Sequence, residues 1–318
     1  MLLKQFNTPV ALIVFNRPET TSQVLSAIRK VKPKQLFVIA DGPRTNNLED
    51  KKNCELVRKI IDDIDWDCQI YKKYSEINLG CGKGPSNGIS WVFNNVNECI
   101  ILEDDCIPDL SFFRFCEELL EKYRYDCRIM MISGNYHLLE KKRIEYSYFF
   151  SRNTQTWGWA TWKRAWDFYD YEMTLWPEVK KSRWLERVLG TKQCVKYWER
   201  LFDECYKDKT RDYWDYQWTF CCWAQNALNI IPDRNLVTNI GVGDLGGSHF
   251  TGIHCPFVNL PVYEIEFPLR HPPVMIQHIE ADNQIQKDVY GQGSLCYRIK
   301  SKLGECAREL SLNIKLKQ

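Results

Sequence analysis

Short apolar segments rich in Val and Ile alternate with helical segments along the first 134 residues of the chain. Apolar runs of this length are typical of strands that are buried on both faces of a sheet. Repeated β–α units predict an α/β fold, Rossmann-like, with a mostly parallel sheet flanked by helices. The predicted strands are residues 9–16, 36–41, 68–74, 99–104 and 128–134.

Helices are expected between these strands. Pro18 with Thr20 and Thr21 is a typical helix start, and the pattern continues to Lys30. Further helices are predicted over 48–64, from the end of a glycine-rich stretch to about residue 97, and over 111–123.

Polar or glycine-rich stretches follow four of the predicted strands. Arg17 follows the first strand, Asp41 and Gly42 follow the second, residues 78–84 follow the third, and residues 103–105 end the fourth. Ligands of open α/β sheets bind outside the carboxyl ends of the strands. We therefore expect these four stretches to meet at one rim of the sheet and to form the binding site.

The glycine-rich stretch NLGCGKG is not a dinucleotide fingerprint. A G-x-G-x-x-G spacing would require glycine at position 85, which is Pro85, and there is no Walker A sequence. Its backbone amides, with Lys83, could still approach a phosphate. A plain turn between strand and helix explains the glycines equally well.

Three consecutive acids, Glu103, Asp104 and Asp105, end the apolar run CIILEDD. Adjacent carboxylates repel one another, so their crowding at the end of a strand predicts a cation or a set of polar partners. A divalent cation there could also bind the phosphates of a nucleotide diphosphate and neutralise the charge of that leaving group. A solvated surface cluster is the alternative.

Composition excludes several classes of function and location. The net charge of +2 gives no basic field for nucleic acid. The 14 Cys include no CxxC pair and no zinc-ligand spacing, which favours a reducing compartment. No signal peptide or transmembrane segment is recognisable, so a cytoplasmic location is expected. The basic tail, 298–318, is either a solvated helix or a peripheral contact with the inner face of a membrane.

Aromatic residues are concentrated in the second part of the chain. Of the 12 Trp, ten lie between Trp157 and Trp223. The chain also carries, in order, VFNRPETT, IADGPR, NLGCGKG, ILEDDCIPDLSFF, WGWATWKRAW, WDYQW and NLVTNIG. This ordered set, over about residues 9–250, resembles glycosyltransferases of the GT-A fold. More narrowly, it resembles bacterial nucleotide-sugar transferases related to Golgi N-acetylglucosaminyltransferase I.

The resemblance implies roles for residues on the donor side. The EDD triplet would be the DxD-type motif, with Asp105 on a Mn²⁺ or Mg²⁺ ion and the other two acids on the sugar and ribose. Arg17 would reach the diphosphate and Asp41 the base. The implied donor-binding residues are Arg17, Asp41, Gly42, Lys83, Gly84, Glu103 and Asp104.

The resemblance also implies a general base, Asp215, which follows Trp214 in YWDYQW. Such a carboxylate would remove the proton from the acceptor hydroxyl of an inverting transferase. Alternatively, or in addition, Asp215 caps the helix that it opens.

An acceptor or sugar pocket is implied at Trp157, Gly158 and Trp159, with Trp214. Trp162 and Trp166 are four residues apart, which is typical of core positions in a helix. A late histidine near the metal, His249, is either a ligand or a structural residue.

Together these observations predict a metal-dependent, inverting glycosyltransferase of the hexosyl- or N-acetylhexosaminyl-transferring type. It would move a sugar from a nucleotide diphosphate to a saccharide or lipid-linked saccharide. A non-catalytic sugar-binding module and a sugar nucleotidyltransferase are the alternatives. The predicted organisation is a nucleotide-sugar-binding half (1–134), an acceptor and catalytic half of the same domain (135–260), and a C-terminal extension (261–318).

Overall fold

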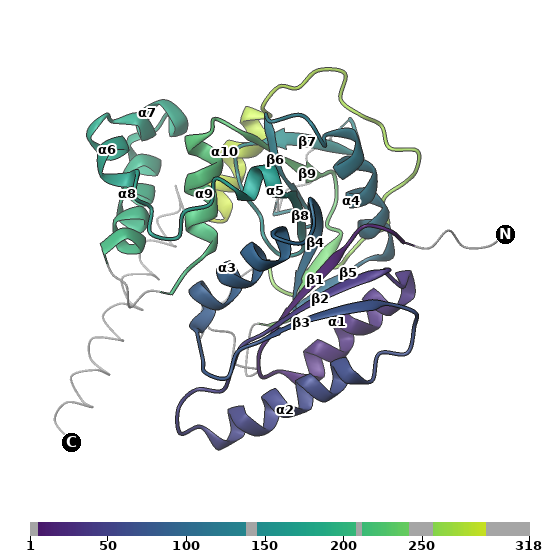
Figure 1. The fold of residues 1–318 in the computed structure, drawn as a ribbon. Helices are drawn as coiled ribbons and strands as arrows, with labels where there is room; N and C mark the ends of the chain where they lie inside the picture. Colours follow the sequence, from purple (N-terminus) through teal and green to yellow (C-terminus); the bar gives the residue numbers. More distant parts are fainter. Residues whose placement is uncertain (1–5, 138–144, 208–211, 242–256, 291–318) are drawn as a thin grey trace.

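The structure, a computed structural model, describes residues 6–137, 145–207, 212–241 and 257–290. Within them, eight strands form one sheet in the order β3-β2-β1-β4-β8-β6-β9-β7 (Figure 1). The strands are β1 (Val10–Val14), β2 (Gln35–Ala40), β3 (Gln69–Tyr74), β4 (Glu98–Glu103), β6 (Ile129–Ser133), β7 (Tyr148–Ser151), β8 (Trp159–Trp162) and β9 (Leu228–Pro232). A mostly parallel sheet with flanking helices confirms the predicted fold class.

The four strands β3, β2, β1 and β4 are parallel neighbours, so their carboxyl ends lie along one edge. Each was predicted to within about two residues. The predicted fifth strand is β6, but β6 does not pair with β4. The antiparallel strand β8 lies between them and pairs with both. The predicted boundary at residue 134 therefore runs through a single continuous sheet.

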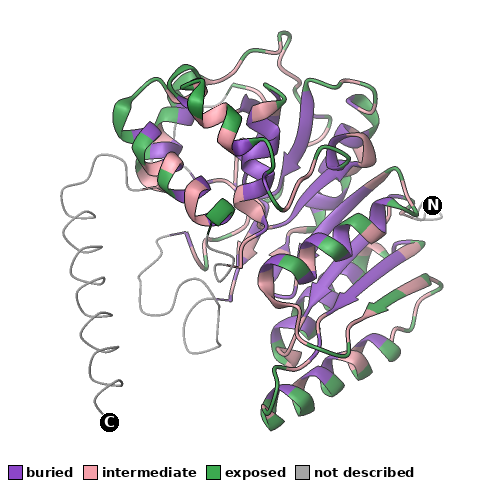
Figure 2. Ribbon diagram, turned by 60° about the vertical axis from the view of Figure 1, so that its left-hand side comes forward, coloured by how far each residue is buried: buried purple, intermediate pink, exposed green. Residues whose placement is uncertain are grey.

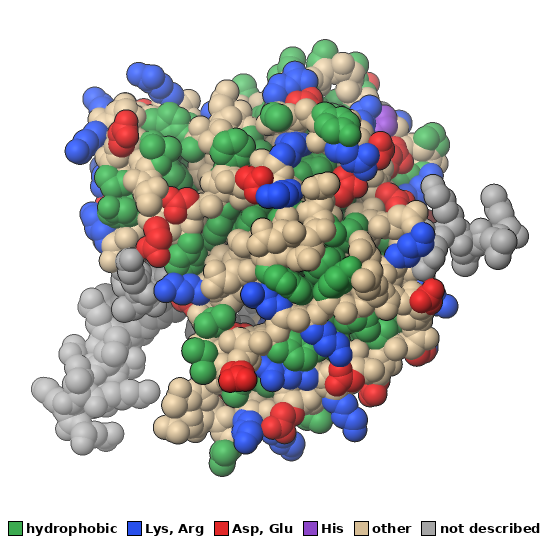
Figure 3. All heavy atoms as spheres, viewed as in Figure 1, with side chains coloured by type: hydrophobic (Ala, Val, Ile, Leu, Met, Phe, Trp, Pro, Cys, Tyr) green, Lys and Arg blue, Asp and Glu red, His purple; other side chains and the backbone are tan. Residues whose placement is uncertain are grey.

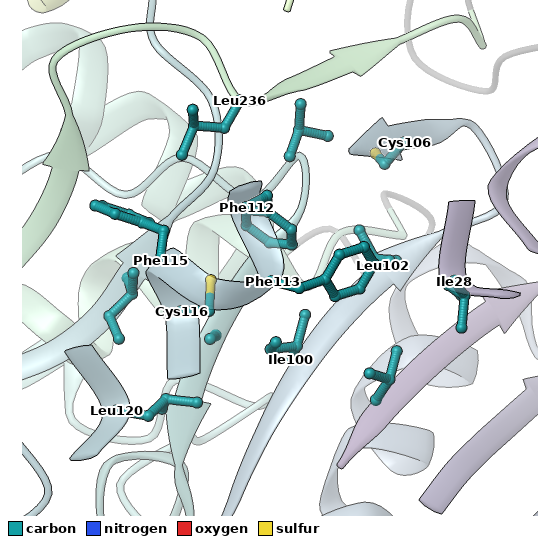
Figure 4. Packing of buried hydrophobic residues seen from close by; sticks show 14 of the residues in the cluster. Ile28, Ile100, Leu102, Cys106, Phe112, Phe113, Phe115, Cys116, Leu120 and Leu236 are labelled. Carbon is teal, nitrogen blue, oxygen red and sulfur yellow. The ribbon is translucent and has the colours of Figure 1, made fainter. Parts of the chain in front are cut away.

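Alternate residues of the central strands pack on opposite faces, and helices cover both (Figure 2). On one face lie α1 (Pro18–Val31), α2 (Leu48–Asp62) and α4 (Leu110–Lys122). On the other lie α3 (Gly80–Phe93), α5 (Lys163–Trp166) and α9 (Asp215–Ala224). Figure 4 shows the first core, where Phe112 and Phe113 of α4 lie over Ile100 and Leu102 of β4.

Helix α3 begins earlier than the sequence predicted. It starts at Gly80, so Gly82, Gly84 and Pro85 lie inside its first two turns rather than in a turn before it. Pro85, the sixth residue of the helix, has no amide hydrogen, so the carbonyl oxygen of Cys81 lacks its usual intrahelical donor. Gly80 has a φ of 84°, in the left-handed region that favours glycine.

A third, aromatic core lies at one side of the sheet (Figure 1). It joins α9 to α6 (Trp176–Lys181), α7 (Trp184–Leu189) and α8 (Lys192–Lys207). Trp176, Trp198 and Phe202 are fully buried there. Much of the unusual tryptophan content of residues 157–223 is therefore core rather than surface.

The C-terminal extension contributes a helix that the sequence analysis did not predict, α10 (Ile279–Asp288). Ala281 and Ile285 pack on Phe149 of β7 and Ile231 of β9. Asp282 accepts hydrogen bonds from the Ser151 hydroxyl and the Arg152 amide, among others. Residues 279–288 thus belong to the packed domain, whereas the basic tail lies outside the described residues.

Charges of both signs are interspersed over the face shown in Figure 3, in keeping with the small net charge. Among the residues that the structure describes, no helix combines the length and apolar character needed to cross a bilayer.

Candidate functional site

Arg17 and the acidic triplet form the centre of the site, at the carboxyl ends of β1 and β4. Arg17 stands just before α1, held there because the Thr20 and Thr21 hydroxyls donate to its carbonyl oxygen. Its guanidinium donates to Asp104 and, over 2.9 Å, to Asp105. The arginine, predicted to reach a diphosphate, thus bridges two of the three predicted acids.

Asp104 and Asp105 are 2% and 7% exposed, which makes their charges costly. Asp104 also accepts from the backbone amide of Phe15 over 3.2 Å. Burial raises the pKa of Asp104 to about 6 and the charge of Asp105 adds to the shift, although Arg17 acts in the opposite direction. Burial also disfavours the charge of Arg17, but the two aspartates outweigh it and raise the pKa of the guanidinium. The single positive charge of Arg17 therefore pairs with two buried carboxylates.

Glu103 keeps some exposed surface, and its side chain makes no hydrogen bond or ion pair with the described residues. Burial and the charges of Asp105 and Asp104 raise its pKa to about 8, with Asp215 contributing. Three acids beside one arginine repel one another, which favours a bound proton or a bound cation. Carboxylate oxygens, with Glu103 partly exposed, are the donor type that suits a hard cation.

A short antiparallel pair of strands covers Asp105. β10 (Val237–Asn239) pairs with β5 (Cys106–Pro108), and the Asn239 side chain donates to Asp105 over 3.3 Å. Gly241 follows, and a Cβ at that position would lie 1.9 Å from Asp105 Oδ2 and 2.8 Å from Arg17 Nη1. The sequence analysis quoted NLVTNIG only as part of a resemblance and missed Asn239 and Gly241 as site residues.

The ends of β2 and β3 carry a second cluster, centred on Asp41. Its carboxylate accepts backbone amides of Gly42, Leu79 and Gly80 and the side-chain amide of Asn78, over distances of 2.8–3.1 Å. Burial raises the pKa of Asp41, although these amides act in the opposite direction. Asp41, predicted to bind a base, here fastens the loop before α3 to the end of β2.

Close packing explains the glycines beside Asp41. A Cβ on Gly42 would lie 2.6 Å from the backbone of Ile77. Gly84 is buried near the Asp41 carboxylate, with 3.5 Å between its Cβ position and Asp41 Oδ2. Lys83 is exposed, and its ammonium lies 6.0 Å from the ring centre of Tyr171.

Asp215 opens α9, in the first turn after the N-cap residue Trp214. A carboxylate in a first turn is stabilised by the helix dipole. Asp215 lies one residue after the N-cap position, which Trp214 occupies without a side-chain cap hydrogen bond. The charge of Asp215 contributes to the raised pKa of Glu103, so the two carboxylates are near enough to interact. The predicted base and the predicted DxD-type motif thus come from opposite halves of the chain to one region.

The predicted sugar pocket is only partly at the surface. Trp157 keeps exposed area and packs edge-to-face on His137, with 4.8 Å between ring centres. Trp159 is completely buried and Trp214 is 6% exposed, and their rings stack 5.6 Å apart. These two rings are therefore part of the core. Trp162 and Trp166 are buried core residues as well. Trp162 belongs to a strand, β8, rather than to a helix.

Gly158, between Trp157 and Trp159 in the sequence, has a φ of 69°, and its Cβ position lies 2.7 Å from Val237. His249 lies outside the described residues. Among the residues described, no group of three or more His, Cys, Asp and Glu side chains is arranged to bind a metal ion by itself. A cation here would need ligands from a substrate as well, which is how Mg²⁺ is commonly held.

Comparison with known proteins gives distant structural neighbours. No family model and no curated protein matches the chain. The inositol-1-phosphate CTP transferase from T. maritima is 8% identical, with a TM-score of 0.40, over 76% of this chain and 93% of that one. Residues 1–349 of S. aureus TarS are 11% identical, with a TM-score of 0.34, over 49% and 47%. Mouse xyloside xylosyltransferase 1 is 9% identical, with a TM-score of 0.34, over 70% and 83%.

Proposed function

We infer that this chain is a metal-dependent, inverting glycosyltransferase that uses a nucleotide-diphosphate sugar. The observation that carries the inference is the contact of Arg17 with Asp104 and Asp105 at the strand ends, with Asp215 close enough to affect the pKa of Glu103. A carboxylate cluster for a cation and a separate carboxylate for proton removal are the two groups that such a transfer requires.

Asp105 is the residue proposed to hold Mn²⁺ or Mg²⁺, with the diphosphate oxygens and water completing the ligands. The bound ion would neutralise the negative charge that builds on the diphosphate leaving group. Arg17 holds the Asp104 and Asp105 carboxylates in place, so that an ion would meet a fixed donor set. Glu103 and Asp104 are proposed to contact the sugar and ribose.

Asp215 is the proposed general base. It would accept the proton of the acceptor hydroxyl as that oxygen attacks the anomeric carbon from the face opposite the diphosphate. The bond from the anomeric carbon to the diphosphate oxygen breaks, and the nucleoside diphosphate leaves with that electron pair. A single displacement inverts the configuration at this carbon. Trp157, which retains exposed ring surface, is proposed to stack on a sugar ring.

The test is a panel of nucleotide-diphosphate sugars, each incubated with the full chain, Mn²⁺ or Mg²⁺, and saccharide or lipid-linked saccharide acceptors. Release of nucleoside diphosphate that requires the metal and stops with EDTA would support the proposal. Release of pyrophosphate from a nucleoside triphosphate and a sugar phosphate would identify a nucleotidyltransferase instead. Sugar binding with no turnover of any donor would identify a binding module.

A further inference from the structure

Helix α3 has a notch at its amino end, where Gly80 and Gly82 face the chain that leads into α9. A Cβ on Gly80 would lie 1.8 Å from Asp212 Oδ2, and one on Gly82 would lie 2.2 Å from Asp212 Oδ1. The Gly82 position is also 2.8 Å from the carbonyl oxygen of Tyr213. The glycines therefore leave the space in which the Asp212 carboxylate and the following backbone lie.

Polar contacts hold Asp212 in this notch. The backbone amide of Lys83 and the hydroxyl of Tyr171 each donate to Asp212 Oδ1 over 3.3 Å. The thiol of Cys81 donates to the Asp212 carbonyl oxygen over 3.0 Å. Side chain and backbone of one residue are thus fixed to the first turn of α3 and to the segment that precedes α6.

Asp41 occupies the same helix end from the other side. It accepts the amides of Leu79 and Gly80, while Asp212 accepts the amide of Lys83. Two carboxylates from distant parts of the chain thus accept the amides for which the sequence analysis considered a phosphate as one of two alternatives. The amino end of α3 is an internal junction between the donor half and the helical side of the domain.

The junction lies three residues before Asp215. Trp214 lies between Asp212 and Asp215, and its ring stacks on the buried Trp159. The chain between Asp212 and the first turn of α9 therefore has little conformational freedom. Figure 1 shows the chain entering α9 beside the lower end of α3. A residue tied to α3 therefore also determines where α9 begins relative to the strand ends.

We propose that Asp212 is a positioning residue: seated in the glycine notch of α3, it fixes the start of α9 and thereby places Asp215 against the donor half. The role assigned to Asp215 rests on the proposed function. The contacts that hold Asp212 in the notch, called the tether below, do not. Asp212 touches neither donor nor acceptor in this proposal.

Hydrogen–deuterium exchange tests the tether without any activity. In Asp212→Ala, peptides covering 79–84 and 214–222 should exchange about 10-fold faster, the range for losing one or two hydrogen bonds. Asp212→Asn keeps an acceptor oxygen and should change exchange less. Gly82→Ala is compatible with a helix, but its Cβ would displace Asp212, so it should have the same effect as Asp212→Ala. It replaces Asp212→Ala in the experiment if that variant does not fold.

Two controls accompany these variants. Asp67→Ala removes an exposed aspartate away from the notch and should leave both peptides unchanged. Gly84→Ala adds a methyl group to the same helix, where the nearest atom is 3.5 Å away, and should leave peptide 214–222 unchanged. Unchanged exchange of 214–222 in Asp212→Ala and Gly82→Ala would overturn the proposal.

Kinetics test the positioning role. Asp212→Ala should lower kcat about 10-fold or more with little change in the donor KM, because the base rather than the donor is misplaced. Faster exchange with unchanged kcat would overturn the positioning of Asp215. If the wild-type chain transfers no sugar, the proposed function fails, while the exchange data still decide whether Asp212 fixes α9.

Discussion

Arg17 Nη1 lies 2.9 Å from Oδ2 of Asp105, and the same guanidinium also bonds Asp104. The Arg17 side chain is 19% exposed, against 3% and 10% for its two partners. Breaking a buried pair leaves charges without a counterion, which costs more than the intact pair contributes. Arg17 is thus expected to contribute to the stability of the fold through these two pairs.

Arg17→Met should therefore lower the free energy of unfolding by about 2 to 4 kcal/mol, the range for a buried pair reduced for partial exposure. Urea unfolding at neutral pH measures it. Arg29→Met is the matched control, because the Arg29–Asp65 pair is more than half exposed and should contribute less than about 1 kcal/mol. Mn²⁺ should restore part of the loss in Arg17→Met only. Equal losses in the two variants would contradict this account.

Glu103 should make stability depend on pH. Its pKa in the folded protein, about 8, lies above the ordinary 4.5, so the folded state binds the proton more tightly than the unfolded state. The contribution of this group to the free energy of unfolding is full below about pH 4.5 and is lost as the pH rises to about 8.

Glu103→Gln should consequently equal the wild type in stability near pH 4.5 and exceed it above pH 8. Unfolding by urea at several pH values measures the difference between the two proteins. Glu55→Gln, at an exposed position of α2, should show no such trend. A stability difference that does not grow with pH would mean that Glu103 is not held near its neutral form.

Asp41→Ala should destabilise the loop before α3, because four donors lose their acceptor. The expected loss is about 1 to 2 kcal/mol, as for removal of a helix cap. Urea unfolding of Asp41→Ala beside Asp63→Ala, an exposed aspartate at the end of α2, measures it. Calorimetry with a nucleoside diphosphate on the same proteins separates this from base binding. Weakened binding with no loss of stability would favour the base contact.

The sequence predicted the strands best where the strands were long and apolar. β1, β2 and β4 were recognisable because buried parallel strands are continuous Val, Ile and Leu runs. β8 has four residues, two of them Trp, and its place between β4 and β6 depends on pairing that no local pattern records. The same limit applies to α10, which is held by the distant Ser151 and Arg152.

The site was predictable as a set of residues but not as a network. Strand ends placed Arg17 and the acidic triplet on one rim, and their contact spans 87 and 88 residues of sequence. Nothing local showed that Asp41 would bind amides of its own chain, or that Asp212 would fill a notch at Gly80 and Gly82. Whether these amides and glycines already have a partner in the same chain depends on loop conformations that the tertiary structure determines.

Asp215→Asn should separate an inverting enzyme from a binding module. The substitution keeps the shape of the side chain, so folding and donor binding should persist, with about 0.3 to 1 kcal/mol lost from the helix dipole. Transfer should fall roughly 100- to 10,000-fold, the range for losing a positioned base. Steady-state rates measure it, with the donor that the panel of nucleotide-diphosphate sugars identifies.

The control for Asp215→Asn is Glu49→Gln, which removes an exposed first-turn acid from α2, away from the site. It should lose similar helix-dipole stability and no rate. NMR of the wild-type product should show the anomeric configuration opposite to that of the donor, since one displacement with one base inverts the carbon. Wild-type transfer by Asp215→Asn, or retained configuration, would leave Asp215 only the role of a first-turn acid that stabilises α9.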